Sequence, residues 1–526
     1  MSRRSLINRT VVTTAQMQAI EARIFAAGMP VAALMEKVAN RIAAVIRSRY
    51  PVADYPQVGV LVGPGHNGGD ALVVARELYF SGYAVRVWVP CDRLKALTQQ
   101  HLAYLRSLGI PIHQALPVSD CDVWLDGLFG FGLSRDVTGD VALLIEAVNG
   151  TGAPIVSIDL PSGIQTDTGQ VLGTAIRATD TLCLGLWKAA FLQEDALPYL
   201  GESTLVDFDI PAADITAVLG NMPLVQRVDP AWALASLPRS RPPTTHKYQM
   251  GNLLLVCGSD RYAGAAILAG LGARASGVGM VTIAVPASLK SLLHAQLPEA
   301  LIIPCPETAT GTIQSLPSEL DLSQYSTIGC GCGLTQEPQA VIELILGSRM
   351  PVVLDADGLN MAATHPSWLQ RSATTVLTPH LGEFRRLFPA IDLTDRLVAV
   401  RAAAAQSDTI LLLKGARVAI GHRSGQVRVN PASTPALARG GSGDVLTGLL
   451  AGLMAQVSMT APSENDLLDT VQAAAWWHAQ AGRRLVGDRT ELGVDAHTLA
   501  HSLNLALQSW LDDCCLLDDC CSLDDF

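Results

Sequence analysis

The stretch ARGGSGDVLTGLLAGL, residues 438–453, carries the strongest indication of fold and chemistry in this sequence. Glycines and a serine leave the backbone accessible before an apolar helix, and Asp444 stands at the start of that helix. Bare amides at a helix N-terminus favour an anion, and glycines let it come close. The pattern predicts a phosphate site in which Asp444 takes a proton from a hydroxyl group that attacks phosphorus. The structural alternative is a glycine-rich turn in which Asp444 only caps the helix.

Short apolar runs alternate with helical patterns along the rest of the chain. Runs this uniformly apolar are typical of strands covered on both faces. The β-α-β-α order predicts an α/β protein with two doubly wound domains, and residues 416–430 predict an antiparallel hairpin. The predicted strands lie within residues 58–63, 83–90, 122–127, 153–163 and 180–186 of the first half, and 251–260, 279–286, 351–360, 374–380 and 409–415 of the second.

The chain has 526 residues, which is more than one domain usually holds. A stretch with prolines, polar residues and weak periodicity predicts a linker over 223–245. We therefore expect an N-terminal domain over 1–222 and a C-terminal domain over 246–510. Residues 511–526 form an acidic tail with paired cysteines, which we expect to be disordered because adjacent cysteines lack the spacing of a structural zinc site.

The composition argues against several classes of protein. A net charge of -11 and a pI near 5.5 are unlike the basic face of a nucleic-acid binder. No apolar run reaches the roughly 18 residues of a membrane span. No apolar run follows the basic residues near the N-terminus, so we expect no secretory signal. The expectation is a cytoplasmic protein without nucleic-acid or membrane partners.

Polar side chains follow several predicted strands of the second half. Ligands bind at the carboxyl ends of strands in open α/β sheets, so these side chains are candidates for one site. A glycine-rich turn over 329–334 follows another strand in the same way. The candidates are Lys414 and Gly415 as nucleotide contacts, Asp355, Asp357 and Asn360 as polar contacts or metal ligands, and His380 with Glu383.

The first half has a glycine loop over 63–69 between a predicted strand and a predicted helix, the form of a phosphate site. Three neighbouring strand ends would present Asn67, Asp126 and Ser162 as oxygen ligands. Such a set, with low total charge, suits a monovalent or weakly held cation better than zinc. Asp159 then becomes the candidate for proton transfer, with a capping role as the structural alternative.

The second half resembles the ADP- or ATP-dependent NAD(P)H-hydrate dehydratase family, which has a ribokinase-like fold. The resemblance rests on GSDRYAGA at 258–265, PE at 298–299, TPHLGE at 378–383 and GGSGDVLTG at 440–448. It implies that Asp444 helps the C6 hydroxyl of a hydrated nicotinamide to attack the terminal phosphate of ADP or ATP. Loss of phosphate then restores NADH or NADPH, and ADP leaves as AMP; the resemblance also implies Mg²⁺. The implied substrate contacts are Ala265, Gly331, His380 and Asp444, and the implied nucleotide contacts are Lys414, Gly415, Ala416, Arg417, Val418 and Gly443.

The chain departs from that family's pattern on the nucleotide side. The usual GPGLG turn is GCGCG here, with Cys330 and Cys332. Val418 stands where a threonine is usual, and Arg439 also replaces a common threonine. A Gly-Asn pair before the signature is replaced by Ser-Thr at 433–434.

The first half resembles the NAD(P)H-hydrate epimerase family over roughly residues 10–215. The family's NNGGDG appears as HNGGDA, with His66 and Ala71 as the replacements. The resemblance implies a Rossmann-like α/β/α sandwich that exchanges the R and S configurations at C6, with Asp159 as the catalytic residue and potassium held by Asn67, Asp126 and Ser162. The implied substrate contacts are His66, Asn67, Gly68, Gly69, Asp70, Gly130, Phe131, Gly132, Leu133, Ser134, Arg135, Asp136 and Asp159.

The two resemblances together predict a bifunctional lyase and isomerase that acts on hydrated NADH and NADPH, and they imply a homo-oligomer. One alternative is a vitamin or sugar kinase fused to a non-catalytic Rossmann-like binding domain, because related folds carry unrelated functions. Another is a purely binding, scaffold-like first half.

Overall fold

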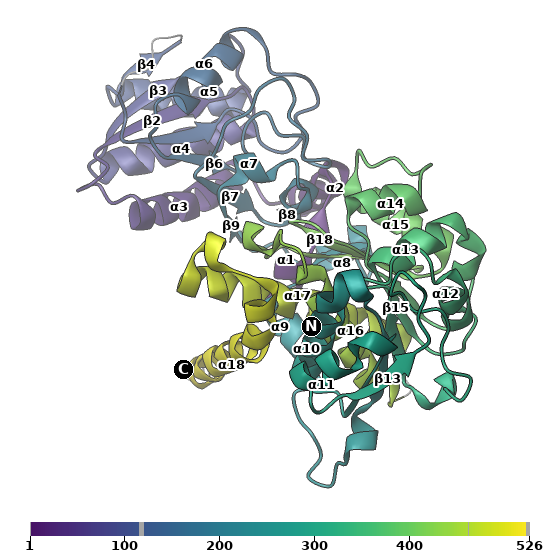
Figure 1. Ribbon diagram of the computed structural model, residues 1–526. Coiled ribbons are helices and arrows are strands. Elements are labelled where there is room, and N and C mark those ends of the chain that lie inside the picture. The colour runs from purple at the N-terminus through teal and green to yellow at the C-terminus, as the bar shows by residue number, and fades with distance from the viewer. Residues whose placement is uncertain (1, 115–119, 461, 522–526) are drawn as a thin grey trace. The chain divides into compact units, whose positions relative to one another are not determined.

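The computed structural model describes residues 2–114, 120–460 and 462–521. The chain divides into two compact units, Met1–Arg227 and Val228–Phe526. Each unit has its own parallel sheet with helices packed on it (Figure 1). The predicted α/β class with two doubly wound domains is confirmed.

Unit 1 contains a seven-stranded parallel sheet in the order β4-β3-β2-β5-β6-β7-β9. Its strands are β2 (Gln57–Val62), β3 (Ala84–Trp88), β4 (Ile112–His113), β5 (Val123–Gly127), β6 (Ile155–Ile158), β7 (Asp180–Leu184) and β9 (Glu202–Val206). A parallel pair, β1 (Val11–Val12) and β8 (Trp187–Lys188), lies outside it, and β10 (Val225–Arg227) ends the unit. The helices are α1 (Arg3–Arg9), α2 (Thr14–Ala26), α3 (Val31–Arg49), α4 (His66–Phe80), α5 (Ala96–Ser107), α6 (Gly139–Asn149), α7 (Leu197–Leu200) and α8 (Ala212–Leu219).

Helices cover both faces of this sheet because its side chains are apolar on both. Val60 and Val62 belong to a buried cluster completed by α2, α3, α4 and α5. Leu61, between them, points to the other face and joins Trp124 and Val148 of α6 in a second cluster. Successive side chains of a strand alternate between faces, so an unbroken apolar strand needs cover on each side.

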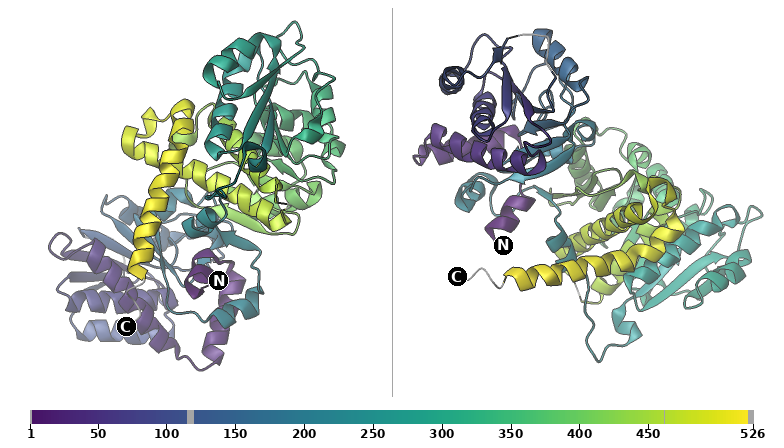
Figure 2. Two further views of the ribbon diagram at one scale, coloured as in Figure 1. Left: turned by 90° about the horizontal axis from the view of Figure 1, so that it is seen from below. Right: turned by 90° about the vertical axis from the view of Figure 1, so that its left-hand side faces the viewer.

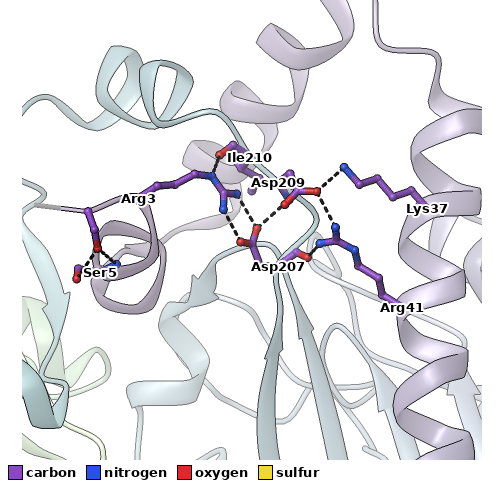
Figure 3. Close-up of polar contacts among 8 residues, drawn as sticks. Arg3, Ser5, Lys37, Arg41, Asp207, Asp209 and Ile210 are labelled. Carbon is purple, nitrogen blue, oxygen red and sulfur yellow. Dashed lines mark hydrogen bonds and ion pairs between the residues drawn. The ribbon is translucent and has the colours of Figure 1, made fainter. Parts of the chain in front are cut away.

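A polar clamp holds the segment that follows β9. Arg3 donates to both carboxylate oxygens of Asp207, at 2.6 and 2.8 Å, and Arg41 donates to Asp209 at 2.6 Å (Figure 3). Phe208, between the two aspartates, is buried. The clamp thus fixes an aromatic side chain that forms part of the cavity described below.

Unit 2 carries its strands in the order β19-β18-β17-β16-β15-β14-β11-β12-β13. Pairs from β13 to β17 are parallel, and the predicted hairpin is confirmed, because β17-β18 and β18-β19 are antiparallel. The strands are β11 (Asn252–Val256), β12 (Met280–Pro286), β13 (Leu301–Cys305), β14 (Thr327–Cys330), β15 (Val352–Leu354), β16 (Thr375–Leu377), β17 (Ile410–Leu413), β18 (Val418–Gly421) and β19 (Val427–Asn430). The helices are α9 (Pro230–Ala235), α10 (Ala263–Ser276), α11 (Lys290–Gln296), α12 (Gln339–Leu346), α13 (Ala356–Thr364), α14 (Leu381–Leu387), α15 (Arg396–Ser407), α16 (Ser442–Ser458), α17 (Glu464–Arg489) and α18 (Ala496–Cys521).

Helix α16 is the central helix of unit 2 and is buried along nearly its whole length. It packs against α10, α17 and the long C-terminal helix α18, drawn in yellow in Figure 2. Glycines allow the close approach of α10: a Cβ at Gly448 would lie 1.8 Å from the carbonyl oxygen of Ala269. The last glycine of the GGSGDVLTG signature is therefore needed for packing.

Both units reverse the direction of their strand order at the first strand of the sheet. In unit 1 the reversal lies between β2 and β5, and in unit 2 between β11 and β14. Loops at such a point diverge to opposite faces and leave a crevice at the carboxyl ends of the strands. The fold thus provides one crevice in each unit.

Two segments differ from the expected domain boundaries. The stretch 223–245, expected as a linker, contains β10 and α9, and Ala233 and Leu234 of α9 are buried in the core of unit 2. Helix α18 extends to Cys521, into the tail expected to be disordered, and residues 522–526 lie outside the described part. Within the described residues, no helix combines the length and hydropathy required to cross a membrane.

Candidate active sites

A cavity of about 650 Å³ lies in unit 1 at the reversal between β2 and β5. The loops after these strands form one side of it, and α2 and α3 contribute many of its apolar side chains. The predicted substrate contacts that line it are His66, Asn67, Asp70, Gly130, Phe131, Gly132, Leu133, Ser134, Arg135 and Asp159.

Three predicted contacts do not line this cavity. Gly68 and Gly69 lie inside α4, where a Cβ at Gly68 would fall 2.1 Å from the Gly63 carbonyl oxygen and one at Gly69 would fall 2.6 Å from Met35. These glycines let the helix pack against its own loop and against α3. Asp136 is exposed at the end of its loop.

Asp159 lies on the cavity floor in an ion pair with Lys188, which is fully buried. The Phe131 amide donates to Asp159 Oδ2 at 2.9 Å and the Leu184 amide donates to Oδ1 at 3.3 Å, so three groups fix the carboxylate. Asp159 has a φ of 71°, a left-handed conformation that is uncommon outside glycine and is often found at functional sites. Burial alone would lower the pKa of Lys188, but the charge of the Asp159 carboxylate opposes this, and the pKa of Lys188 is raised.

Two further acids face the same cavity, Glu21 from α2 and Asp70 from α4. Burial raises the pKa of Glu21 to about 7, and the charge of Asp159 adds to the rise while Lys188 opposes it. Burial raises the pKa of Asp70 well above its usual range, and Asp159 and Glu21 raise it further. Carboxyl groups with pKa values near neutrality are typical of acid–base catalysis.

The three predicted potassium ligands lie around the end of β5. Asp126 is fully buried and accepts hydrogen bonds from Ser162 Oγ at 2.6 Å and from Ser157 Oγ at 2.8 Å. Burial raises its pKa, and these hydrogen bonds oppose the rise. Asn67 Nδ2 is buried without a hydrogen-bond partner among the described residues. The carboxylate, hydroxyl and amide oxygens of this singly charged set fit a monovalent cation, whereas Asn67 Nδ2 is a hydrogen-bond donor and would not be a ligand.

In unit 2 the predicted residues meet at the ends of neighbouring strands. Lys414, after β17, forms an ion pair of 2.7 Å with Asp355, after β15. Asp355 also accepts a 2.7 Å hydrogen bond from Thr447 of α16. A Cβ at Gly443 would lie 3.4 Å from Lys414 Nζ, so the glycine loop borders this pair directly.

Asp444 occupies the first turn of α16 and contacts the thiol of Cys332. Burial raises the pKa of Asp444 to about 6, and the nearby charge of Asp355 raises it while the Cys332 thiol and Lys414 oppose the rise. His478 of α17 holds the loop in place by donating from Nε2 to the carbonyl of Ser442 at 3.0 Å. Burial lowers the pKa of His478 to about 4, so this ring is neutral near pH 7.

The remaining predicted substrate contacts of the dehydratase site are Ala265, Gly331 and His380. The glycine turn after β14 packs on the start of α10, because a Cβ at Gly333 would lie 2.8 Å from Ala265 Cβ. A glycine is needed for packing at position 331, since a Cβ added to Gly331 would lie 1.8 Å from the Asp355 carbonyl oxygen. His380 is an exposed N-cap of α14, and its backbone donates to Glu383 at 2.8 Å.

Comparison with known proteins relates both halves of the chain to established families. Residues 253–505 match the NAD(P)H-hydrate dehydratase family, and residues 31–190 match the family of YjeF-related protein N-termini. A bifunctional NAD(P)H-hydrate repair enzyme, Nnr, of a Synechocystis species is 52% identical over 96% of each chain. The chain belongs to the bifunctional NAD(P)H-hydrate repair family. The Nnr protein of Gloeobacter violaceus is 50% identical over 94% of this chain and 97% of its own.

A solved structure also resembles unit 2. It is an ADP/ATP-dependent NAD(P)H-hydrate dehydratase from Bacillus subtilis, co-crystallised with ATP and Mg²⁺, with 29% identity and a TM-score of 0.44. It matches 53% of this chain and 96% of its own. Membership of the repair family over nearly the full chain favours that function over a kinase joined to a non-catalytic domain.

Several predicted residues of the repair enzyme lie away from the Asp355–Lys414 pair. Arg417 donates a hydrogen bond to the Pro431 carbonyl oxygen, and Val418 is the first residue of β18. Asp357 accepts from the Thr335 amide at 2.9 Å, and Asn360 accepts from Arg386 at 2.9 Å. Ala416 is exposed in the loop before β18.

Sequence reasoning missed Lys188, Glu21, Thr447 and the contact between Cys332 and Asp444. Lys188 had a signal, because it is the one charged residue in the apolar run from 181 to 193. A lysine in such a run is rarely buried without a partner. No feature of the sequence indicated that Glu21 lines a cavity, since an acid on an amphipathic helix ordinarily faces solvent.

Replacing Lys188 with methionine is expected to destabilise unit 1 by about 3–5 kcal/mol, because it leaves a buried carboxylate unpaired. Denaturant-dependent hydrogen exchange, followed by peptide mass, would show faster exchange in unit 1 and unchanged exchange in unit 2. The double variant Lys188→Met/Asp159→Asn removes both charges and should recover part of the loss. Equal protection in Lys188→Met and the parent would mean that the pair contributes nothing to stability.

Proposed function

We propose that this chain repairs hydrated NADH and NADPH with two sites, an epimerase in unit 1 and a nucleotide-dependent dehydratase in unit 2. The single observation that carries the proposal is the position of Asp444, an acid with a pKa of about 6 at the start of α16, between the glycine loop and the Asp355–Lys414 pair. A base that is ionised at neutral pH beside a phosphate-binding loop is what phosphorylation of a hydroxyl requires.

In the dehydratase site, the amides around Gly443 would hold the terminal phosphate of ADP or ATP, and Lys414 would balance its charge. Asp444 would accept the proton of the C6 hydroxyl as that oxygen bonds to phosphorus, and AMP would leave from ADP. The phosphorylated oxygen is then a better leaving group, and its loss restores the ring double bond. Within the described part of the chain, no group of three or more His, Cys, Asp or Glu side chains is suited to hold a metal.

In the epimerase site, Asp159 would move protons at C6 while Lys188 orients its carboxylate. Asn67, Asp126 and Ser162 would hold potassium, which would offset the buried charge of Asp126. The apolar side chains of α2 and α3 would keep water away from the nicotinamide ring.

The test is to add ADP to a mixture of both epimers of hydrated NADH and to follow the absorbance of reduced nicotinamide. The proposal predicts conversion of the whole pool, with AMP and inorganic phosphate released in equal amounts. A phosphorylated product that accumulates without reduced nicotinamide would point to a kinase. Conversion that stops when one epimer is consumed would remove the epimerase half of the proposal.

A further inference from the structure

Glu21 is an ionisable residue of the unit 1 cavity to which the proposed function gives no task. It belongs to α2, where Met17, Gln18 and Phe25 line the cavity with it. Among the described residues, no hydrogen bond or ion pair is made by the Glu21 carboxyl group. A half-buried acid without a partner lowers stability, and such a residue at a cavity is a candidate for chemistry.

The loop over 130–132 connects the two sides of the cavity. A Cβ at Gly130 would lie 3.1 Å from Asp159 Oδ2 and 3.2 Å from Asn67 Oδ1, so the missing side chain leaves room for a ligand against Asp159. A Cβ at Gly132 would lie 3.8 Å from Gln18 Nε2, so the other end of the loop borders α2. Glu21 follows Gln18 by three residues and shares its face of the helix. A ring bound between the two sides of the cavity would have Asp159 on one side and the polar residues of α2 on the other.

We propose that Glu21 is a second catalytic residue of the epimerase, the acid that protonates the leaving hydroxyl at C6 of the hydrated nicotinamide. The proposal rests on the proposed function of unit 1. It assigns Glu21 and Asp159 to the two opposite faces of C6.

The reaction is balanced by loss and return of one water molecule. Glu21 gives its proton to the C6 hydroxyl, the C6–O bond breaks with its electron pair on the departing water, and the N1 lone pair forms a C6–N1 double bond. Water then adds to the other face of C6, and the double-bond electrons return to N1. Asp159 accepts the proton of the added water, and proton exchange with solvent resets both acids. Nothing is oxidised or reduced.

The charges around Glu21 suit an acid that cycles near neutral pH. The pKa of Glu21 is raised to about 7, because the effect of burial, to which the charge of Asp159 adds, exceeds the opposing effects of Lys188 and Lys95. Burial raises the pKa of Asp70, from α4, well above its usual range, and the charges of Asp159 and Glu21 contribute to the rise. His66 and Arg135 also line the cavity.

The test compares Glu21→Gln with the parent in the full chain, starting from one pure epimer of hydrated NADH. The expected kcat for epimerisation falls about 10²-fold or more while KM stays the same, because glutamine fills the same space without a proton to give. In the parent, kcat should fall as the pH rises through about 7, because Glu21 loses its proton there. This alkaline limb of the pH profile should be absent in Glu21→Gln. A parental kcat and pH profile in Glu21→Gln would overturn the proposal.

The matched control is Glu36→Gln on the neighbouring helix α3. Glu36 pairs with Arg76 at 2.6 Å and does not line the cavity, so its kcat for epimerisation should equal that of the parent. Glu21→Asp keeps an acid and should retain the pH limb with a reduced kcat, which a purely structural role would not produce. Loss of the limb in Glu21→Asp would contradict the proposal even if Glu21→Gln fails to fold.

Epimerisation in water labelled with heavy oxygen tests whether the C6–O bond breaks. Each inversion should introduce one solvent oxygen at C6, and inversion without labelled oxygen would overturn the step. Failure of the parent itself to interconvert the epimers would instead remove the epimerase function and leave no reaction for Glu21 to catalyse. The two failures are therefore distinguishable in one series of measurements.

Discussion

Asp444→Asn is expected to lower the rate of nucleotide-dependent dehydration about 10³-fold or more, because asparagine cannot accept the hydroxyl proton during attack on phosphorus. Asparagine is close to aspartate in size, so α16 and its glycine loop should keep their packing. The loss should fall on kcat, since the glycine loop and Lys414 that would hold the nucleotide are unchanged. Release of inorganic phosphate and recovery of reduced nicotinamide, measured together from the S epimer, give the rate.

The pH dependence of the parent provides an independent check on Asp444. A base must be ionised to work, and the pKa of Asp444 is raised to about 6. Dehydration should therefore be full near pH 8 and fall as pH decreases through about 6. Asp466→Asn, an exposed carboxylate in the capping box of α17, is the matched control and should leave rate and pH profile unchanged. Parental dehydration by Asp444→Asn would rule out Asp444 as the base.

Asp159→Asn is expected to reduce epimerisation by about 10²–10⁴-fold, the usual contribution of one acid–base group, and to leave dehydration of the S epimer intact. Asparagine tolerates the left-handed backbone at this position better than alanine does. It can also accept the hydrogen bond from the Phe131 amide that holds the aspartate. The variant therefore removes the charge with the smallest change in the cavity.

Separate readouts make this expectation decisive. Interconversion of the purified epimers reports on unit 1, and phosphate release from the S epimer reports on unit 2. Unchanged hydrogen exchange in unit 1 would show that Asp159→Asn has not unfolded that unit, whereas unchanged dehydration reports only on unit 2. If one substitution, Asp159→Asn or Asp444→Asn, abolished both activities in a folded protein, the assignment of one reaction to each unit would be wrong.

The α/β class and most strands could be predicted from sequence, because strands covered on both faces leave unbroken apolar runs. Strands with a weak apolar pattern were not predicted. β13 has an exposed Leu301 and a proline at 304, and β9 is only partly buried. The glycine signatures indicated where backbone must be bare. They could not distinguish glycines that border a site, such as Gly130 and Gly443, from those needed for packing, such as Gly68 and Gly331.

By itself the sequence determined the two-unit α/β architecture, the glycine loops and the acids that follow strands, since hydrophobic periodicity and local turn chemistry are encoded in neighbouring residues. Only the tertiary structure decided which charges are paired. Lys188 meets Asp159 from 29 positions away, and Lys414 meets Asp355 from 59. Glu21 enters the cavity because α2 folds over it. The strength of an ion pair and the pKa of an acid depend on distance and burial in three dimensions. The separation of two residues along the chain determines neither their distance in space nor their burial.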